Sequence, residues 1–296
     1  MNSEFDAIYT SATEPFRSEL KQFRQTHTLN VVYLKDKKWT YFVGGQGDKV
    51  ILVLHGGGGP AESLFRYIMR FEDKYRVIAP TVPSSVNCVT EVVNATLEIL
   101  NREAVPAVHI FGVSNGGMIA QCLVRQYPQK VLSLILFHSM LPSTDYAKVF
   151  GKRVRLLSIL PLWITIALGQ KWVIKQLQSE EANAKPGELA FWIAYFKELY
   201  RSELVTKEYL VSRARILTDY FQNYQFTPND LINWNGRVFI IESENDQVVN
   251  EHERERLKNF YNQPKVHTFM GSGHLSGGLF ETEETVALID DFIVLK

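Results

Sequence analysis

Short apolar segments alternate with helix-like segments through the first half of this chain. Residues 49–54, 75–79, 108–113 and 131–137 read as strands, and helix-like stretches separate them. Strands that are apolar throughout and are joined by helices are typical of a parallel sheet covered by helices on both faces. We therefore predict an α/β fold built around a mostly parallel central sheet.

The alternation stops near Leu141 and resumes at Arg237. Residues 142–220 carry helix-like patterns and no convincing strand. Apolar side chains at helical spacing usually bury a helix against its neighbours. We expect most of the large ones here to do so and the remainder to line an apolar pocket: Leu156, Leu157, Leu160, Trp163, Trp172, Phe191, Trp192, Tyr195, Phe196 and Tyr200.

One serine stands between a strand and a helix in the sequence Gly112-Val113-Ser114-Asn115-Gly116-Gly117. A G-x-S-x-G motif at such a junction makes a sharp turn that exposes the serine hydroxyl, and the glycines let the backbone bend that tightly. The spacing alone is only moderately specific, so its neighbours have to support it. The motif predicts a nucleophile at Ser114.

Two further strands end in residues that complement a nucleophilic serine. Asp246 follows the strand 237–241, and His274 follows the strand 266–270. A serine hydroxyl needs a base to accept its proton and an acid to orient that base. Because Ser114, Asp246 and His274 each come just past a strand, we expect them to meet at one edge of the sheet.

These motifs, with the glycine-rich loop His55-Gly56-Gly57-Gly58-Gly59-Pro60 after the strand 49–54, resemble the α/β-hydrolase superfamily. The resemblance covers roughly residues 29–296. It implies the α/β-hydrolase fold, with Ser114 as nucleophile, Asp246 as acid and His274 as base. It also implies an oxyanion hole formed by the backbone amides of Gly57 and Asn115.

The same resemblance divides the chain. Residues 29–141 and 221–296 would form the hydrolase core, and residues 142–220 a helical cap inserted after the sixth strand. Residues 1–28 are polar, and their pattern is helix-like near Glu14 to Gln25; we interpret them as a lead-in arm.

Other residues compete for the roles of base and acid. His138 ends the sixth strand and is the main alternative base, whereas His55 opens the glycine loop, where we expect it to hold the loop backbone. The alternative acids are Glu242, Glu244 and Asp145. We favour Asp246 because S-x-x-D-x-V-V best matches the family's G-x-x-D-x-V pattern.

A closer resemblance connects the chain to the maspardin-like branch of the superfamily. It rests on the segments FRSELKQFRQTHTLNVVYLKDKKWTYFVGG, YRVIAP, HIFGVSNGGMIAQ, SLILFHS and NDQVV. Members of that branch are often viewed as binding or adaptor proteins that lack a complete triad. His274 and the HGGGG loop depart from that pattern. We therefore predict a serine hydrolase that cleaves a carboxylic ester, thioester or lactone through an acyl-enzyme. A non-catalytic binding protein, or an amide or C–C bond hydrolase, is the alternative.

The charge balance and the motifs of the chain limit which ligands and binding partners we expect. Lys plus Arg (32) equals Asp plus Glu (32), which gives no reason to expect nucleic-acid binding. The spacing of Cys88 and Cys122 matches no zinc motif, and there is no H-E-x-x-H or nucleotide-binding glycine motif. We expect no metal and no cofactor, and a small, apolar molecule as substrate.

The apolar segments are too short for a membrane span. The strongest, residues 156–168, is 13 long and contains Pro161. Residues 1–10 lack the features of a signal peptide, so we expect a cytoplasmic protein. Because Arg153, Arg155 and Lys171 flank the apolar segment, association with a lipid surface is a further alternative.

Overall fold

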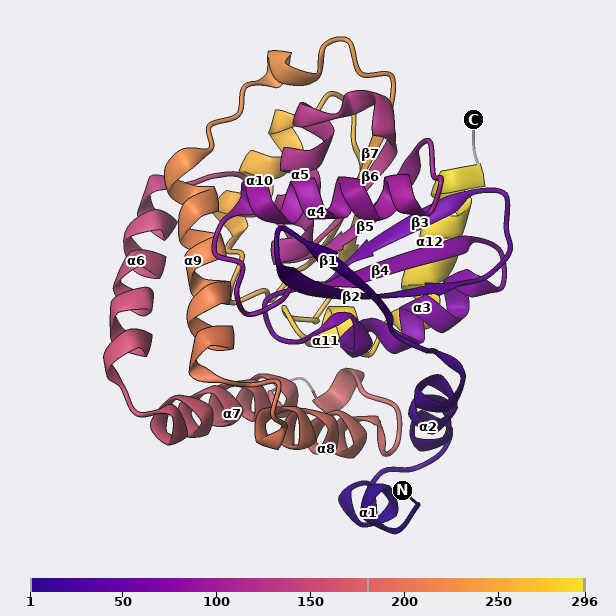
Figure 1. The fold of residues 1–296 in the computed structure, drawn as a ribbon, viewed down its shortest axis with the longest axis vertical. Helices are drawn as coiled ribbons and strands as arrows, with labels where there is room; N and C mark the ends of the chain where they lie inside the picture. Colours follow the sequence, from indigo (N-terminus) through magenta and orange to yellow (C-terminus); the bar gives the residue numbers. More distant parts are fainter. Residues whose placement is uncertain (1, 180, 295–296) are drawn as a thin grey trace.

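The computed structural model describes residues 2–179 and 181–294 and contains an eight-stranded sheet in the order β1-β2-β4-β3-β5-β6-β7-β8 (Figure 1). The strands are β1 (Asn30–Leu34), β2 (Lys37–Gly44), β3 (Val50–Leu54), β4 (Arg76–Thr81), β5 (Val108–Val113), β6 (Val131–Phe137), β7 (Arg237–Ser243) and β8 (Lys265–Phe269). Strand β2 is antiparallel to β1 and β4, and the other neighbours are parallel. The predicted α/β fold with a mostly parallel sheet is confirmed.

Helices cover both faces of this sheet. The helices of the described residues are α1 (Asn2–Ile8), α2 (Phe16–Thr26), α3 (Phe65–Glu72), α4 (Val89–Arg102), α5 (Asn115–Gln126), α6 (Thr144–Ile159), α7 (Leu162–Gln178), α8 (Glu188–Arg201), α9 (Lys207–Asn223), α10 (Glu251–Phe260), α11 (Ser276–Leu279) and α12 (Thr282–Val294).

The sheet has one apolar core on each face, and alternate residues of each central strand point into one or the other. Leu134 and Leu136 of β6 point into one core, with side chains of α4, α5, α9 and α10. Ile135 and Phe137 point into the other, with side chains of α2, α3, α8 and α12. Successive side chains of a strand face opposite sides, so a strand buried on both faces is apolar at most positions. This explains why these strands were visible as largely apolar runs.

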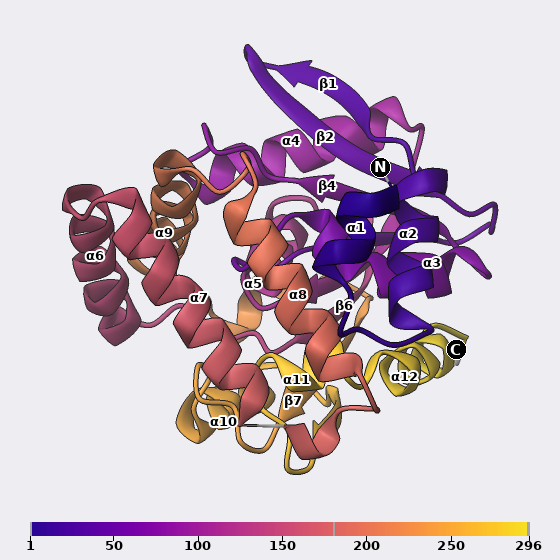
Figure 2. The ribbon, with the colours of Figure 1, turned by 90° about the horizontal axis from the view of Figure 1, so that it is seen from below.

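Four helices, α6 to α9, follow β6 before the sheet resumes with β7. Helix α6 packs along α9, and α7 packs along α8 (Figures 1 and 2). The expectation that large apolar side chains would be buried here holds for α8, whose Phe191 and Trp192 are fully buried. It is wrong for Leu156, Trp163 and Trp172, which are exposed because the outer faces of α6 and α7 meet no other element among the described residues.

Helix α8 is tied to the rest of the protein by buried charges. Arg66 of α3 is almost fully buried and pairs with Glu19 of α2, Glu188 of α8 and Glu283 of α12. Arg24 of α2 makes a second link to α8 through Glu198. A buried cation held by several carboxylates is costly to separate from any one of them, because the group left behind would be unpaired. The N-terminal helices thus fasten α8 to the α3 and α12 side of the sheet.

Candidate active site

The residue Ser114 lies at the sharp turn between β5 and α5, with a positive φ of 52°. Two glycines make this turn possible. A Cβ on Gly116 would lie 2.0 Å from the carbonyl oxygen of Leu54, and a Cβ on Gly112 would lie 2.7 Å from that of Gly116. The Ser114 amide donates to the carbonyl of Phe137 at 2.7 Å, which fixes the turn to the end of β6. The backbone is held in a strained conformation that points the serine away from the sheet.

The three residues Ser114, His274 and Asp246 lie in one hydrogen-bonded row. The Nε2 atom of His274 is 3.1 Å from the Oγ atom of Ser114. The Nδ1 atom of His274 is 2.8 Å from the Oδ2 atom of Asp246. Ser114, Asp246 and His274 follow β5, β7 and β8, so parallel strands deliver all three side chains to the same edge of the sheet.

The carboxylate of Asp246 is fully satisfied. Its Oδ1 atom accepts the backbone amides of Val248 and Val249 at 2.7 and 2.8 Å, and its Oδ2 atom faces His274. Burial by itself would raise the pKa of this carboxyl, but the charge attraction and hydrogen bond of His274 outweigh burial and lower the pKa to about 2. Asp246 is therefore ionised at neutral pH and able to stabilise a positive charge on the imidazole.

The glycine-rich loop after β3 passes directly beside the serine. A Cβ on Gly56 would lie 3.5 Å from the Cβ of Ser114, whereas one on Gly57 would meet no atom within 4 Å. Asn115 is the first residue of α5, and the first amides of a helix have no acceptor within it. The glycine-rich loop and the first residue of α5 thus both lie beside the serine, with open space next to Gly57.

His55 fixes this loop to the sheet. Its Nδ1 atom lies 2.7 Å from the carbonyl oxygen of Gly56, and its Nε2 atom accepts the amide of Val82 at 3.3 Å. Burial, reinforced by the positive charge of Arg213, lowers the pKa of His55 to about 3. The side chain is neutral and holds backbone groups, as predicted for it from the sequence.

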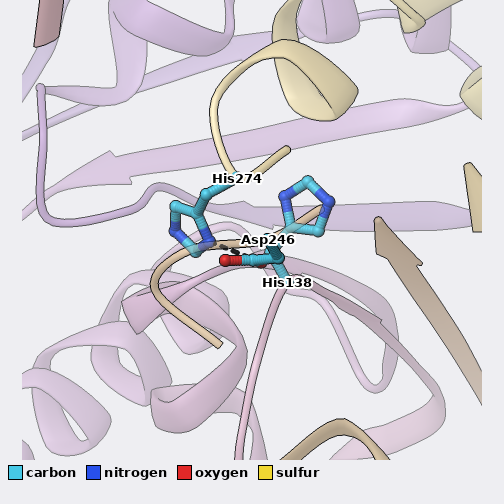
Figure 3. Close-up of side chains that lie close together, drawn as sticks. All are labelled: His138, Asp246 and His274. Carbon is cyan, nitrogen blue, oxygen red and sulfur yellow. Dashed lines mark hydrogen bonds and ion pairs between the residues drawn. The ribbon is translucent and has the colours of Figure 1, made fainter. Parts of the chain in front are cut away.

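The alternative base His138 lies beside His274 in Figure 3, with ring centroids 5.2 Å apart. Its Nε2 atom contacts the Oγ atom of Ser243 at 2.8 Å, and burial lowers its pKa to about 3. It therefore contacts a buried serine of β7 instead of Ser114.

The fold also groups three potential metal ligands that are scattered along the sequence. One ligand atom from each of His138, Asp246 and His274 lies within 4.8 Å of the others. The three residues are far apart in the sequence, so a search for ligand spacing such as H-E-x-x-H could not identify this group. In Figure 3 the dashed contact runs between His274 and Asp246. An ion there would have to replace that hydrogen bond, so metal binding and the hydrogen-bonded row exclude each other.

The three alternative acids point elsewhere. Glu242 contacts Lys258 and Thr268, and Glu244 accepts the amide of Gly271. The Asp145 side chain is 87% exposed, at the start of α6.

Residues of the α6–α9 segment contact the loops that carry Asp246, His274 and Gly59. Sequence reasoning did not identify these contacting residues. Tyr146 of α6 donates to the carbonyl of Val248 at 2.9 Å. Gln176 of α7 donates to Gln247 at 3.0 Å. Between α7 and α8, Asn183 donates to the carbonyl of Gly271 at 3.1 Å, and Leu199 of α8 lies over Gly59. These contacts join segments far apart in sequence, so no local pattern could signal them.

A groove of about 750 Å³ lies away from the serine. The loop after β6, the end of α9 and helix α10 form its walls, with Leu141, Phe221, Phe226, Arg256 and Phe260 among the lining residues. Ser114, Asp246 and His274 do not line it.

Comparison with known proteins agrees with this architecture. The sequence model of the alpha/beta hydrolase fold family matches residues 88–278, and the chain belongs to that family. The uncharacterized hydrolase YcgS of Bacillus subtilis (strain 168) is 31% identical over 103 residues. That match covers 32% of this chain and 36% of YcgS, so the chain spans little more than a third of that relative.

Several solved structures share the fold at low sequence identity. A hydrolase from Pseudomonas aeruginosa PA01 is 16% identical with a TM-score of 0.73, covering 90% of this chain and 99% of that one. The α/β hydrolase MGS-M2 from a deep-sea metagenome library of the Medee basin is 17% identical with a TM-score of 0.74, covering 90% and 98%. These similarities establish the fold alone.

Proposed function

We propose that this chain is a serine hydrolase that cleaves a carboxylic ester, thioester or lactone through an acyl-enzyme on Ser114. The observation that carries the proposal is the hydrogen-bonded row from Ser114 through His274 to Asp246, with contacts of 3.1 and 2.8 Å. A nucleophile within reach of a base that is itself held by a buried carboxylate is the arrangement that this chemistry requires. Membership of the α/β-hydrolase fold family and the name of the relative YcgS support it.

In the proposed reaction, the Oγ atom of Ser114 attacks the acyl carbon while His274 accepts the hydroxyl proton at Nε2. Asp246 stabilises the imidazolium that forms. When the tetrahedral intermediate collapses, the bond to the leaving alcohol or thiol breaks, and His274 donates its proton to that group. Water then attacks the acyl-enzyme, with His274 as its base, and releases the carboxylic acid and Ser114.

The oxyanion of each tetrahedral intermediate would accept the amides of Gly57 and Asn115. A single such donor is worth about 3 to 4 kcal/mol of transition-state stabilisation. The open space next to Gly57 leaves room for a substrate oxygen, and the N-terminus of α5 adds a favourable dipole.

We propose further that α6 to α9 act as a cap over this site. Their contacts with the loops that carry Asp246, His274 and Gly59 support this role. A roof of helices limits water around the acyl-enzyme and favours a small, apolar acyl group.

Labelling by a fluorophosphonate probe tests the nucleophile. We expect the wild-type protein to be labelled, and Ser114→Ala and His274→Ala to lose labelling. His252→Ala, at an exposed histidine, serves as the matched control and should be labelled normally. Circular dichroism of each variant checks that it is folded. A folded wild-type protein that is never labelled would refute the proposal and favour the non-catalytic, maspardin-like alternative.

The substrate class requires its own assay. Hydrolysis of p-nitrophenyl esters of increasing chain length should improve beyond acetate if the pocket is apolar. A labelled protein that cleaves only amides, or only C–C bonds, would keep the nucleophile and reject the ester assignment.

A further inference from the structure

The outer sides of α6 and α7 carry a surface that neither the core nor the candidate active site uses. We call it the apolar–basic face. Its apolar members are Val149, Leu156, Ile159, Trp163, Leu168 and Trp172, and its basic members are Lys148, Lys152, Arg155, Lys171 and Lys175. Ile159 is 77% exposed and Trp163 is 72% exposed. Exposed apolar side chains that occur singly are ordinary, whereas a cluster marks an interaction surface.

Helical periodicity places both kinds of residue together on α6. Val149, Leu156 and Ile159 are spaced by seven and three residues, so they lie on one side of the helix. Lys152 and Arg155 fall between them on that same side. The opposite side holds Ala147 and Phe150, the residues that α6 buries. The apolar groups are therefore interleaved with positive charge on the solvent side of α6.

Helix α7 repeats this arrangement with aromatic residues. Lys171 and Lys175 are four residues apart and lie near the middle of the exposed side, with Trp163 toward one edge and Trp172 toward the other. The buried side of α7 holds Thr165, Val173, Gln176 and Leu177. Tryptophan and lysine are enriched where a protein meets the interface between lipid and water.

The charge of this segment differs from that of the whole chain. Between Thr144 and Gln178 there are six lysine and arginine residues and one acidic residue, Asp145, although the whole chain has a formal net charge of +0. Asp145 is paired with Lys148 at 3.6 Å. The positive charge is thus concentrated where the exposed apolar side chains are, and it complements an anionic partner.

We propose that the apolar–basic face docks on the surface of an anionic lipid bilayer. Interleaved apolar and basic side chains fit an interface in which the apolar groups enter the headgroup region while the cations contact lipid phosphates. None of the described helices is long and apolar enough to cross a membrane, which fits attachment to one leaflet. A second copy of this chain would bring the same positive face, and Asp145 is the one acidic residue between Thr144 and Gln178, so like charges would oppose that pairing.

The position of the junction between α6 and α7 suits such docking. This junction forms an outer corner of the molecule in Figure 1, with Ile159 and Trp163 on either side of Pro161. The corner can touch a flat surface before the rest of the protein does. The buried side of α7 meanwhile reaches the Asp246 loop through Gln176.

Vesicle flotation tests the proposal without requiring hydrolysis. The probes are phosphatidylcholine vesicles with and without 30 mol% phosphatidylglycerol, about a third of the lipid, which gives an anionic surface. We expect binding to the anionic vesicles that weakens as salt is raised, since salt screens the attraction. The Ser114→Ala variant should bind like the wild type, so failure of the proposed hydrolysis would leave this result intact.

Two pairs of variants separate the two components. Lys152→Gln with Arg155→Gln should weaken partitioning about 25-fold, because each basic residue near an anionic surface contributes about fivefold. Ile159→Ser with Trp163→Ser should weaken partitioning onto the vesicles at least tenfold. This factor corresponds to about 1.4 kcal/mol of lost apolar burial. The matched controls are Ile232→Ser, at a residue also 77% exposed, and Arg102→Gln, in the last turn of α4. They should bind normally.

Three outcomes would overturn the proposal. Equal binding to neutral and anionic vesicles would show that the basic residues do not contribute to docking. Equal losses in the controls and in the apolar–basic variants would show that the face is not specific. Absence of vesicle binding, together with self-association that Trp163→Ser abolishes in sedimentation, would assign the face to a second copy of the chain. Because all these positions are exposed, we expect every variant to fold, and thermal unfolding checks it.

Discussion

The central sheet and the α6–α7 pair use apolar residues in opposite ways. All five residues of β3 are buried, whereas α6 buries Ala147 and Phe150 out of its 16 residues. The apolar side chains of the sheet are buried, where they stabilise the fold and fix the positions of the loops at one edge. The α6–α7 pair shows much of its apolar surface to solvent. Folding therefore restricts which residues the sheet can accept much more than it restricts the outer sides of α6 and α7. On those outer sides we expect binding to decide which residues are retained.

The largest contrast concerns the carboxylates near the end of the sheet and at the start of α6. We expect Asp246→Asn to lower kcat for ester hydrolysis about 10⁴-fold, because the amide would favour the wrong tautomer of His274. Asp145→Asn, at an exposed side chain, should leave kcat unchanged. Steady-state kinetics on a p-nitrophenyl ester measures both. A large loss in Asp145→Asn with a small one in Asp246→Asn would reverse the assignment of the acid.

The next contrast compares the same substitution in the two regions. Ile240→Ala in β7, where the side chain is 1% exposed, should lower the free energy of unfolding by about 2 to 5 kcal/mol. Ile159→Ala in α6, where the side chain is 77% exposed, should change it by less than about 0.5 kcal/mol. Denaturant unfolding measures both values. Similar losses would mean that the outer side of α6 is covered in solution.

Two glycines give a contrast in sign. A Cβ on Gly116 would lie 2.0 Å from the Leu54 carbonyl, so Gly116→Ala should destabilise the protein by about 1 to 3 kcal/mol. A Cβ on Gly151 would meet no atom within 4 Å, and Gly151→Ala in α6 should stabilise by about 0.5 to 1 kcal/mol. Thermal unfolding of the two variants is the measurement. Stabilisation at Gly116 would contradict the close approach of β3 and α5.

Acid sensitivity should arise near the sheet edge. Burial lowers the pKa of His55 and His138 to about 3, below the ordinary value of about 6.5. The unfolded chain then binds protons that the folded chain does not, so stability is complete above about pH 6.5 and is lost as the pH falls toward 3. Each histidine contributes a slope of at most about 1.4 kcal/mol per pH unit.

Urea unfolding between pH 7.5 and pH 4.5, a range spanning about three units around the ordinary pKa, measures this slope. His138→Asn should flatten it, and His252→Asn, at an exposed histidine, should not. If the two variants had the same slope, proton uptake by His138 would not contribute.

The sequence was most informative where local pattern and tertiary role coincide. The strands 108–113 and 131–137 were predicted with the bounds that the structure shows, because β5 and β6 are largely buried on both faces and are mostly apolar; their polar residues His109 and Ser133 hydrogen bond to each other. The order of Ser114, Asp246 and His274 past their strands was visible for a similar reason, since parallel strands end at a common edge. The structure brings the three together, and their catalytic role stays a prediction.

The sequence was least informative about contacts between residues that are far apart in the chain and about which apolar side chains are exposed to solvent. Helix α1 went unrecognised within the lead-in arm, because it is short and because Tyr9, just after it, is held by Glu198, a residue far away in the sequence. The bounds 142–220 lie close to those of α6 to α9, yet exposure of Trp163 could not be deduced, since a tryptophan at helical spacing looks the same whether it faces a core or solvent. The grouping of His138 with His274 is likewise a product of strand order alone.

The anchoring of α8 by Arg66 has a practical consequence for protein engineering. Because those ion pairs hold α8 independently, we expect the solvent-facing side chains of α6 and α7 to be replaceable as a set, while the inward-facing ones, such as Phe150, Gln176 and Leu177, are kept. Exchanging that solvent-facing set for the one carried by another family member would test surface binding separately, because the contacts of Tyr146 and Gln176 with the Asp246 loop would be retained.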